Sequence, residues 1–182
     1  MLISSDTNIW LDFSIIGQID HPFLLDNVYY LSSITYHDEI DDKSKIYDSL
    51  VNHELFGELR RCVKENKILI TDATTEELKL AMRYANEYRP PKINNAISMQ
   101  DSIALAIAKK RNWCLLTGDS GLREAAKFEE VVCHGTLWIY DELLRNQLLT
   151  HKEYLGVMNA LLDAVDNKKR RLPRNEIINR IK

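Results

Sequence analysis

Residues 98–122 have the sequence SMQDSIALAIAKKRNWCLLTGDSGL, in which an apolar helical pattern is followed by a short apolar run and a polar turn. The stretch 103–108 is too apolar for a surface helix, which predicts a buried helix over residues 98–110. The run Trp113–Thr117 has no alternation of apolar and polar residues, as is typical of a strand covered on both faces. This segment therefore predicts one helix-strand unit of a parallel sheet.

The same succession of apolar runs and helical patterns extends over most of the chain. Predicted strands cover residues 2–5, 29–32, 67–71, 113–117 and 131–133. Predicted helices cover residues 7–16, 34–40, 47–65, 74–88, 98–110 and 122–128. Non-alternating strands separated by helices predict an α/β fold with a central, mostly parallel five-stranded sheet flanked by helices.

Beyond residue 137 the pattern is only helical. Further helices are predicted over residues 138–144 and 150–164, with a short one after Pro173. We therefore predict one domain over residues 1–148. Residues 149–182 form a C-terminal helical extension that packs on this domain or trails from it.

The composition is that of an ordinary globular protein. The 182 residues include 24 Lys and Arg against 27 Asp and Glu, for a net charge of −3, and 45% of them are hydrophobic. These values exclude a disordered tail, a collagen-like chain and a disulfide scaffold. No apolar run approaches the roughly 18 residues of a membrane helix, and the first residues lack the basic segment of a signal peptide. We therefore expect a cytoplasmic protein with no membrane partner.

Acidic residues follow several of the predicted strands. Asp6 comes directly after the first strand, and Asp119 comes two residues after the fourth. Asp38 and Glu39 lie about two helical turns after the second strand, and Asp101 lies in the first turn of the helix that precedes the fourth. Because loops at the carboxyl ends of parallel strands converge on one crevice, we expect these carboxylates to meet there.

Such a group of carboxylates predicts a metal site. Carboxylates brought together without Lys or Arg repel one another and raise each other's pKa unless a divalent cation neutralises them. Oxygen ligands of this kind suit Mg²⁺ or Mn²⁺, and such an ion generates hydroxide from water and holds a phosphodiester for in-line attack. Each acid also has a structural alternative, since Asp6, Asp101 and Asp119 stand where helix caps are expected.

Four segments carry a more specific pattern in their order and spacing. They are DTNIW from Asp6, YHDEI from Tyr36, MQDSIALA from Met99 and LLTGDSGLR from Leu115. Together they resemble the PIN domain, a metal-dependent ribonuclease fold found in VapC-type toxins and in RNA-processing nucleases. The continuation CHGTLWIYDEL from Cys133, ending in RLPRNE from Arg171, resembles a longer bacterial branch with extra C-terminal helices. The resemblance covers nearly the whole chain and implies a three-layer PIN-like fold.

The resemblance also implies which residues form the catalytic and metal-binding site. The four acids that would hold one or two Mg²⁺ or Mn²⁺ ions are Asp6, Asp38, Asp101 and Asp119. Thr117 matches a Ser or Thr that helps to hold the metal or its waters, and Asn8 is a second supporting residue. The second acid is usually Glu in the family; Glu39 is the substitute for Asp38, and Glu77 is a third alternative. An Asp at this position is shorter than Glu and would act through a water.

The implied partners are an RNA substrate and, for a toxin, an antitoxin protein. Residues 167–182 contain a basic set opposed by Glu176 alone, namely Lys168, Lys169, Arg170, Arg171, Arg174, Arg180 and Lys182. This segment is either an RNA-facing arm or a solvated tail. The leucines of the extension serve either a homodimer or packing onto the sheet; they are Leu148, Leu149, Leu155, Leu161 and Leu162.

The sequence therefore predicts a divalent-metal-dependent endoribonuclease that hydrolyses RNA by metal-activated water. A narrower form of this prediction is that the protein is the toxin of a toxin–antitoxin pair. A non-catalytic PIN-fold module that binds RNA or protein is the first alternative. Phosphoryl transfer through Asp6 is the second. Asn8 disfavours it, because a dehalogenase-like site needs a second Asp at that position.

Overall fold

The computed structural model describes residues 1–41 and 50–182; for residues 39, 41 and 50–55 it describes the backbone alone. Its five strands are β1 (Leu2–Ser5), β2 (Val28–Ser32), β3 (Ile68–Thr71), β4 (Cys114–Leu116) and β5 (Cys133–His134). They form one sheet in the order β3-β2-β1-β4-β5, and every neighbouring pair is parallel. The predicted α/β class and five-stranded sheet are confirmed, and the described sheet is entirely rather than mostly parallel.

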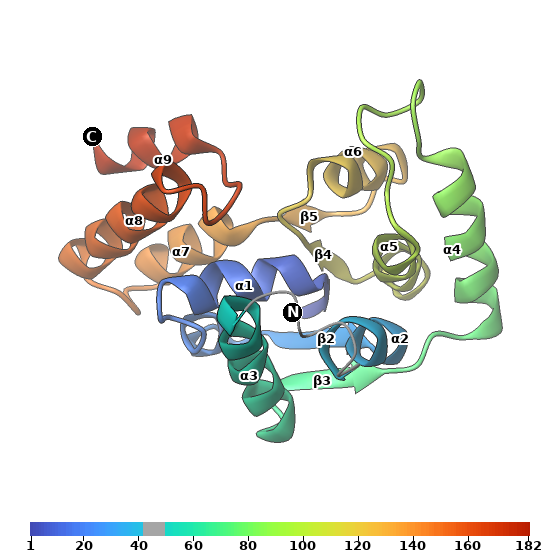
Figure 1. Ribbon diagram of the computed structural model, residues 1–182, viewed down its shortest axis with the longest axis horizontal. Coiled ribbons are helices and arrows are strands. Elements are labelled where there is room, and N and C mark those ends of the chain that lie inside the picture. The colour runs from blue at the N-terminus through green and yellow to red at the C-terminus, as the bar shows by residue number, and fades with distance from the viewer. Residues whose placement is uncertain (42–49) are drawn as a thin grey trace.

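Helices cover both faces of this sheet (Figure 1). The helices of the first 128 residues are α1 (Thr7–Ile15), α2 (Ser33–Thr35), α3 (Leu50–Lys64), α4 (Thr75–Glu87), α5 (Met99–Arg111) and α6 (Ser120–Phe128). The remaining helices are α7 (Thr136–Arg145), α8 (His151–Asp166) and α9 (Arg174–Ile181), with a short 3-10 helix η1 (His21–Leu24) and a π-helix η2 (Tyr36–Asp41). The sheet thus lies between α1, α3 and α7 on one side and α4, α5 and α6 on the other, a three-layer arrangement.

Several predicted elements differ in their bounds, and two differ in ways that affect the backbone pattern. The helix expected over residues 34–40 is a short α-helix, capped by the Ser32 hydroxyl, that continues as the π-helix η2. The last strand begins at Cys133 rather than residue 131, although the backbone N–H of Leu115 still donates to the carbonyl of Val132 (2.8 Å). The beginning of the helix predicted from residue 47 lies outside the described residues.

The hydrophobic core is divided by the sheet into two clusters. On one face, Trp10 and Phe13 of α1 pack with Tyr29 of β2 and with residues of α7 and α8. On the other face, the alanine-rich helix α5 packs against α4, α6 and Leu115. The Ser4 hydroxyl of β1 donates to the carbonyl of Ala104 (3.0 Å), so the small side chains of α5 bring its backbone within hydrogen-bond distance of a strand side chain.

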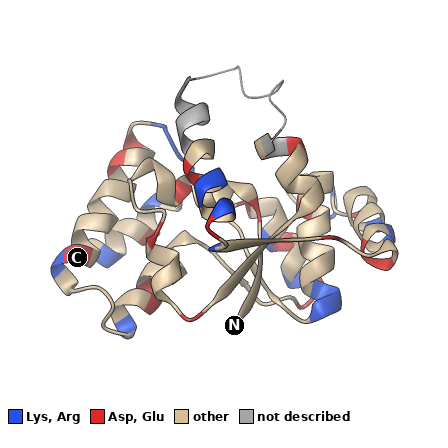
Figure 2. Ribbon diagram, turned by 90° about the horizontal axis from the view of Figure 1, so that it is seen from below, with Lys and Arg blue, Asp and Glu red and all other residues tan. Residues whose placement is uncertain are grey.

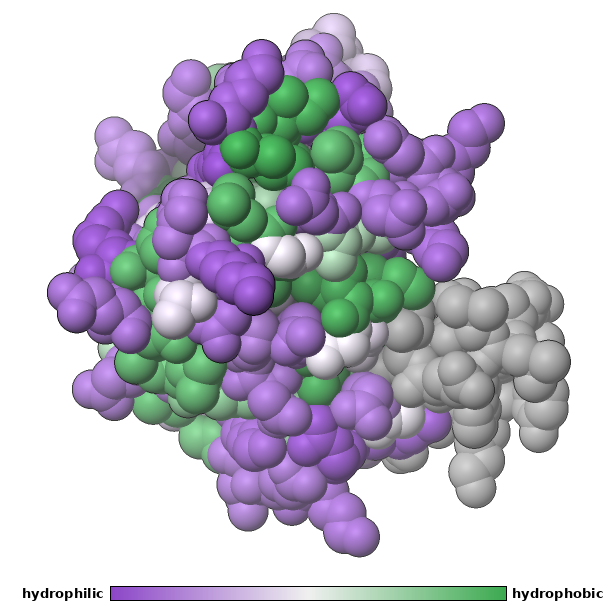
Figure 3. All heavy atoms as spheres, turned by 90° about the vertical axis from the view of Figure 1, so that its left-hand side faces the viewer, coloured by the Kyte–Doolittle hydropathy of each residue, from purple (hydrophilic) through white to green (hydrophobic). Residues whose placement is uncertain are grey.

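The C-terminal helices pack on the α1 and α7 side of the molecule. Leu161 is fully buried and Leu149 is 8% exposed, whereas Leu148 is 43% exposed. Leu155 and Leu162 are partly buried against the same cluster. Figure 3, which faces the side where α7, α8 and α9 lie, shows apolar side chains interspersed with hydrophilic ones. Of the two predictions for this leucine face, packing within the chain therefore accounts for most of its members.

A buried ion pair fastens the segment between α8 and α9 to α1. Asp12 is 2% exposed, and its carboxylate accepts hydrogen bonds from the Arg170 guanidinium (2.5 Å) and the Thr136 hydroxyl (2.6 Å). The same guanidinium donates to the carbonyl of Asn8 (2.8 Å). The basic segment around residue 170 is therefore held next to the first turns of α1.

Charges of both signs occur on both halves of the molecule (Figure 2). This distribution agrees with the net charge of −3. Within the residues that the structure describes, no helix is both long and apolar enough to cross a membrane.

Replacing Arg170 tests the energetic role of this ion pair. We expect Arg170→Gln to lower the free energy of unfolding by about 3 kcal/mol, because it leaves the buried Asp12 charge without its partner. Urea unfolding followed by circular dichroism measures this loss. The double variant Asp12→Asn/Arg170→Gln should lose less than the sum of the single changes, since it leaves no buried charge unpaired.

Arg174→Gln is the matched control. Its pair with Asp166 is half exposed and should contribute less than about 1 kcal/mol. Equal losses in Arg170→Gln and Arg174→Gln would contradict an anchoring role for Arg170.

Candidate active site

Asp6 stands at the carboxyl end of β1, in the middle of the sheet. Its backbone N–H donates to the carbonyl of Leu116 in β4 (3.1 Å), which continues the parallel ladder one step past the strand. Its side chain is the N-cap of α1 and accepts from the backbone N–H of Ile9 (2.9 Å). Only 5% of Asp6 is exposed, so a carboxyl group is buried where the loops after the central strands meet.

Thr117 joins the ends of three neighbouring strands. Its hydroxyl donates to the second carboxylate oxygen of Asp6 and accepts from the backbone N–H of Asp119 (3.0 Å). Its own backbone N–H donates to the carbonyl of His134 in β5 (2.9 Å). This fully buried residue thus couples the position of Asp6 to that of the turn that carries Asp119.

Asp101 and Asp119 are both partly exposed helix caps. Asp119 is the N-cap of α6 and accepts from the backbone N–H of Leu122 through Oδ1 (2.8 Å). Asp101 forms a capping box at the start of α5, in which its Oδ2 accepts from the backbone and hydroxyl of Ser98. The structural alternative predicted for Asp6, Asp101 and Asp119 is therefore correct for all three. In Asp101 and Asp119 the other carboxylate oxygen has no hydrogen-bond donor within the described part of the chain.

The second acid lies close to the start of α5. Asp38 in η2 accepts a hydrogen bond from the side-chain amide of Gln100, the neighbour of Asp101 (3.3 Å). The side chain of Glu39 lies outside the described residues. Glu77 is 3% exposed and its carboxylate binds the Arg111 guanidinium at 2.7 and 2.9 Å, an arrangement that gives it a cationic partner of its own. Of the two alternatives whose side chains the structure describes, Asp38 is hydrogen-bonded to the sequence neighbour of Asp101, and Glu77 is paired with Arg111.

Burial changes the acidity of Asp6. Loss of hydration raises its pKa to about 7, and the nearby charges of Asp101 and Asp12 act in the same direction. The hydrogen bonds from Thr117 and from the backbone of Ile9 oppose this shift. An uncompensated carboxylate in such a place favours either a proton or a cation.

The donor chemistry of these residues fits a hard divalent cation. Among the side chains that the structure describes, no three of His, Cys, Asp or Glu lie close enough together to form a ready ligand group. Mg²⁺ usually takes one or two carboxylates and keeps several waters, so it does not require such a group. Asp6, with either Asp101 or Asp119, supplies carboxylate oxygens of the required kind.

A cavity of about 370 Å³ lies beside Asp119. It is lined by Asn8, Asp12, Gly118 and Asp119 and by residues 168–171, which read Lys-Lys-Arg-Arg. The Arg170 charge is neutralised by Asp12. Lys168, Lys169 and Arg171 form no ion pair with any described carboxylate. Uncompensated positive charge therefore lines the same cavity as Asp119.

Sequence reasoning did not predict the pairing of Asp12 with Arg170. A signal was present, because Asp12 interrupts the otherwise apolar run from Ile9 to Phe13. A charged residue on the buried face of a helix requires a partner. Its partner lies 158 positions away and is one of several adjacent basic residues, so the sequence alone could not select it.

Comparison with protein-family models, with curated proteins and with solved structures gives no match.

The raised pKa of Asp6 predicts a pH-dependent stability in metal-free buffer. In the unfolded chain the carboxyl group ionises near its ordinary pKa of 3.8, whereas in the native state burial raises the pKa to about 7. The native state is therefore favoured at low pH, and this contribution is lost between about pH 4 and 7. Relative to Asp6→Asn, the wild-type free energy of unfolding should fall over this interval by up to about 1.4 kcal/mol per pH unit.

Urea unfolding of both proteins at several pH values in EDTA measures this difference. Asp72→Asn, at an exposed position, controls for the loss of one negative charge. A difference between wild type and Asp6→Asn that stays constant from pH 4 to 8 would show that Asp6 titrates as an ordinary carboxyl group.

Proposed function

We propose that this protein is a divalent-metal-dependent endoribonuclease. The observation that carries the proposal is the buried Asp6 carboxyl at the carboxyl end of β1, whose pKa is raised mainly by burial and further by the Asp101 charge. A carboxylate pair of this kind is stabilised by a cation. The carboxyl ends of the strands are also where open α/β sheets bind their ligands.

Each candidate residue would have its own role in binding the metal ion or the substrate. Asp6, with Asp101, Asp119 or both, would hold Mg²⁺ or Mn²⁺, and Asp38 would contribute through a water. The ion, when bound, would supply an activated water and would neutralise charge on the phosphodiester. Thr117 would orient Asp6 through its hydroxyl and set the distance between Asp6 and the turn of Asp119. Asn8, exposed on the rim of the cavity, would contact substrate or metal-bound water.

The substrate assignment rests on the basic wall of the cavity. Phosphate contacts by Lys and Arg supply most of the non-specific affinity for nucleic acids. Lys168, Lys169 and Arg171 provide such charges in the cavity that Asp119 also lines. Of the two predictions for the C-terminal basic segment, this arrangement favours an arm that faces the RNA.

Relation to the PIN domains is part of the same proposal. It is supported by the order of the four acidic segments and by a three-layer fold with a five-stranded parallel sheet. A toxin–antitoxin role in the cytoplasm, with an antitoxin or a second copy of the chain as partner, stays a prediction from the resemblance.

Cleavage of a mixed RNA pool by the purified protein tests the proposal. We expect cleavage with Mn²⁺ or Mg²⁺ and none with EDTA. Asp6→Asn and Asp101→Asn should each lower the cleavage rate by at least about 100-fold, since even outer-shell residues of metal sites cost 10- to 100-fold. Asp72→Asn should cleave like the wild type.

Cleavage that persists in EDTA or in Asp101→Asn would contradict the proposed chemistry. The capping roles of Asp6, Asp101 and Asp119 favour one other function, an RNA-binding module without catalysis. RNA binding that is insensitive to EDTA, with no cleavage under any condition, would support that alternative.

Thr117 offers a test of positioning. Thr117→Val keeps the shape of the side chain and removes the hydroxyl, so it should weaken Mn²⁺ binding by about 10-fold to 100-fold. Thr117→Ser should retain the affinity. Calorimetric titration with Mn²⁺ measures both, and equal affinities in wild type and Thr117→Val would contradict this role.

A further inference from the structure

A second cavity of about 370 Å³ adjoins the basic wall just described. Gly118 and Arg171 line both cavities, so the two are neighbours on the same surface. The second cavity lies between the start of α7, the loop after β4 and the segment that leads into α9. Its volume is within the range typical of small-ligand sites.

Positive charge is concentrated in this second cavity. Arg123, Arg171 and Arg180 line it, with Glu176 as the only carboxylate among its lining residues. Arg180 is already paired with Asp141 (2.7 Å). Arg123 and Arg171 form no ion pair with any carboxylate in the described ranges. Two guanidinium groups are therefore free to bind an anion.

The position of Arg123 is fixed by the surrounding backbone. Its guanidinium donates to the carbonyl of Thr117 (3.3 Å), the residue that holds Asp6. A Cβ atom at Gly135 would collide with the same guanidinium, so the glycine at the N-cap of α7 leaves room for it. Arg123 thus lies directly beside the proposed catalytic residues.

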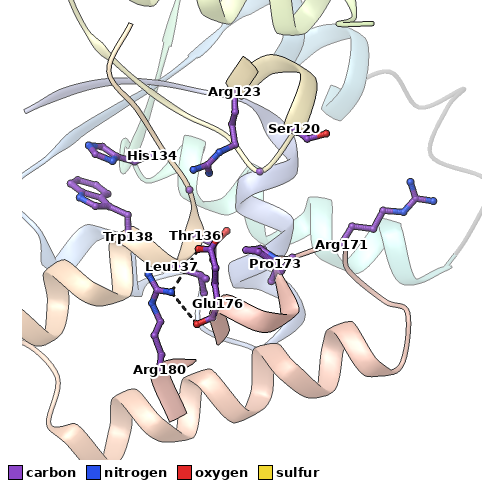
Figure 4. A pocket seen from close by; sticks show the side chains of 13 residues that line it. Ser120, Arg123, His134, Thr136, Leu137, Trp138, Arg171, Pro173, Glu176 and Arg180 are labelled. Atoms are coloured by element: carbon purple, nitrogen blue, oxygen red, sulfur yellow. Dashed lines mark hydrogen bonds and ion pairs between the residues drawn. The ribbon is translucent and has the colours of Figure 1, made fainter. Parts of the chain in front are cut away.

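A flat aromatic pair forms another wall of the cavity. The rings of His134 and Trp138 are stacked, with centroids 4.0 Å apart and planes inclined by 6°. Both are partly exposed, and in Figure 4 they lie together on one edge of the cavity, with the Arg123 guanidinium beside them. Burial and the Arg123 charge lower the pKa of His134, so this imidazole is neutral at neutral pH and the pair is suited to contact with a base.

We propose that this cavity binds a nucleotide of single-stranded RNA next to the scissile bond, with its base against the His134–Trp138 pair and its phosphate on Arg123. Arg171, whose side chain points away from the aromatic pair in Figure 4, would contact the next phosphate along the strand. The inference rests on the proposed ribonuclease function and adds a subsite to it. Guanidinium groups match phosphate geometry with paired hydrogen bonds. Aromatic side chains stack on bases that are free of a duplex. Because Arg171 borders both cavities, a strand that leaves the basic wall at residues 168–171 enters this one directly.

Binding of a fluorescein-labelled single-stranded RNA 12-mer of mixed sequence, measured by anisotropy in EDTA, tests the subsite without cleavage. Arg123→Gln and Arg171→Gln should each weaken binding and lower the slope of log K against log salt by about 0.7. Arg83→Gln, an exposed arginine of α4 outside both cavities, is the charge-matched control and should bind within about twofold of the wild type.

Two further substitutions test the shape of the cavity separately from its positive charge. Trp138→Leu should weaken binding by about 5-fold to 100-fold and leave the salt slope unchanged, whereas Trp138→Phe should retain most of the affinity. Gly135→Ala displaces the Arg123 guanidinium without removing its charge and should also weaken binding. Circular dichroism melting curves identify any variant that is not folded.

The results of these experiments distinguish a failure of the proposed subsite from a failure of the proposed ribonuclease function. Wild-type protein that binds and cleaves RNA, together with unchanged affinity in Arg123→Gln, Arg171→Gln and Trp138→Leu, would overturn the subsite alone. Wild-type protein that neither binds nor cleaves RNA would overturn the ribonuclease proposal and the subsite with it. A duplex of the same sequence that binds as tightly as the single strand would overturn the base contact, because paired bases cannot reach the aromatic pair.

Discussion

The hydrogen bond from the Thr117 hydroxyl to the buried Asp6 carboxylate is the interaction on which the candidate site depends. Asp6 cannot be left in a dry interior without donors, because an unpaired buried carboxylate is costly. Thr117 supplies one donor and the first turn of α1 supplies another. Since the Thr117 hydroxyl also accepts from the turn of Asp119 and its backbone N–H donates to β5, this one residue sets the spacing between the ends of three strands.

The second constraint is the Asp12–Arg170 ion pair, which holds the segment between α8 and α9 against α1. Without a cation at this point, the burial of Asp12 would oppose its charge. Arg170 supplies that cation and in doing so places its neighbours Lys168, Lys169 and Arg171 around a cavity that also contains Asp119. The need of the buried Asp12 for a cationic partner therefore determines where the basic segment 168–171 lies on the surface.

The residues of the site were predictable to different extents. Asp6 and Asp119 follow strand ends, and the register of a parallel sheet brings such positions together, so strand periodicity was enough to select them. Asp38 was distinguished from Glu77 only by the tertiary structure, in which Gln100 binds Asp38 and Arg111 binds Glu77. Arg123, His134 and Trp138 lie in segments that carry the family resemblance, but nothing in their spacing predicted a shared cavity, because a single Arg or aromatic residue in a helix-strand region is most often a surface or core residue.

The sequence by itself determined the α/β class, the five strands and the caps of the main helices, because these follow from local periodicity and from side chains three residues apart. The sequence-based prediction was wrong in two details, the π-helix after β2 and the start of β5, where neighbouring elements alter the backbone. Only the tertiary structure decided the protonation of Asp6, the partner of Asp12 and the two cavities at the carboxyl ends of the strands. These depend on burial and on charges that are far apart along the chain, and neither is encoded in the spacing of residues.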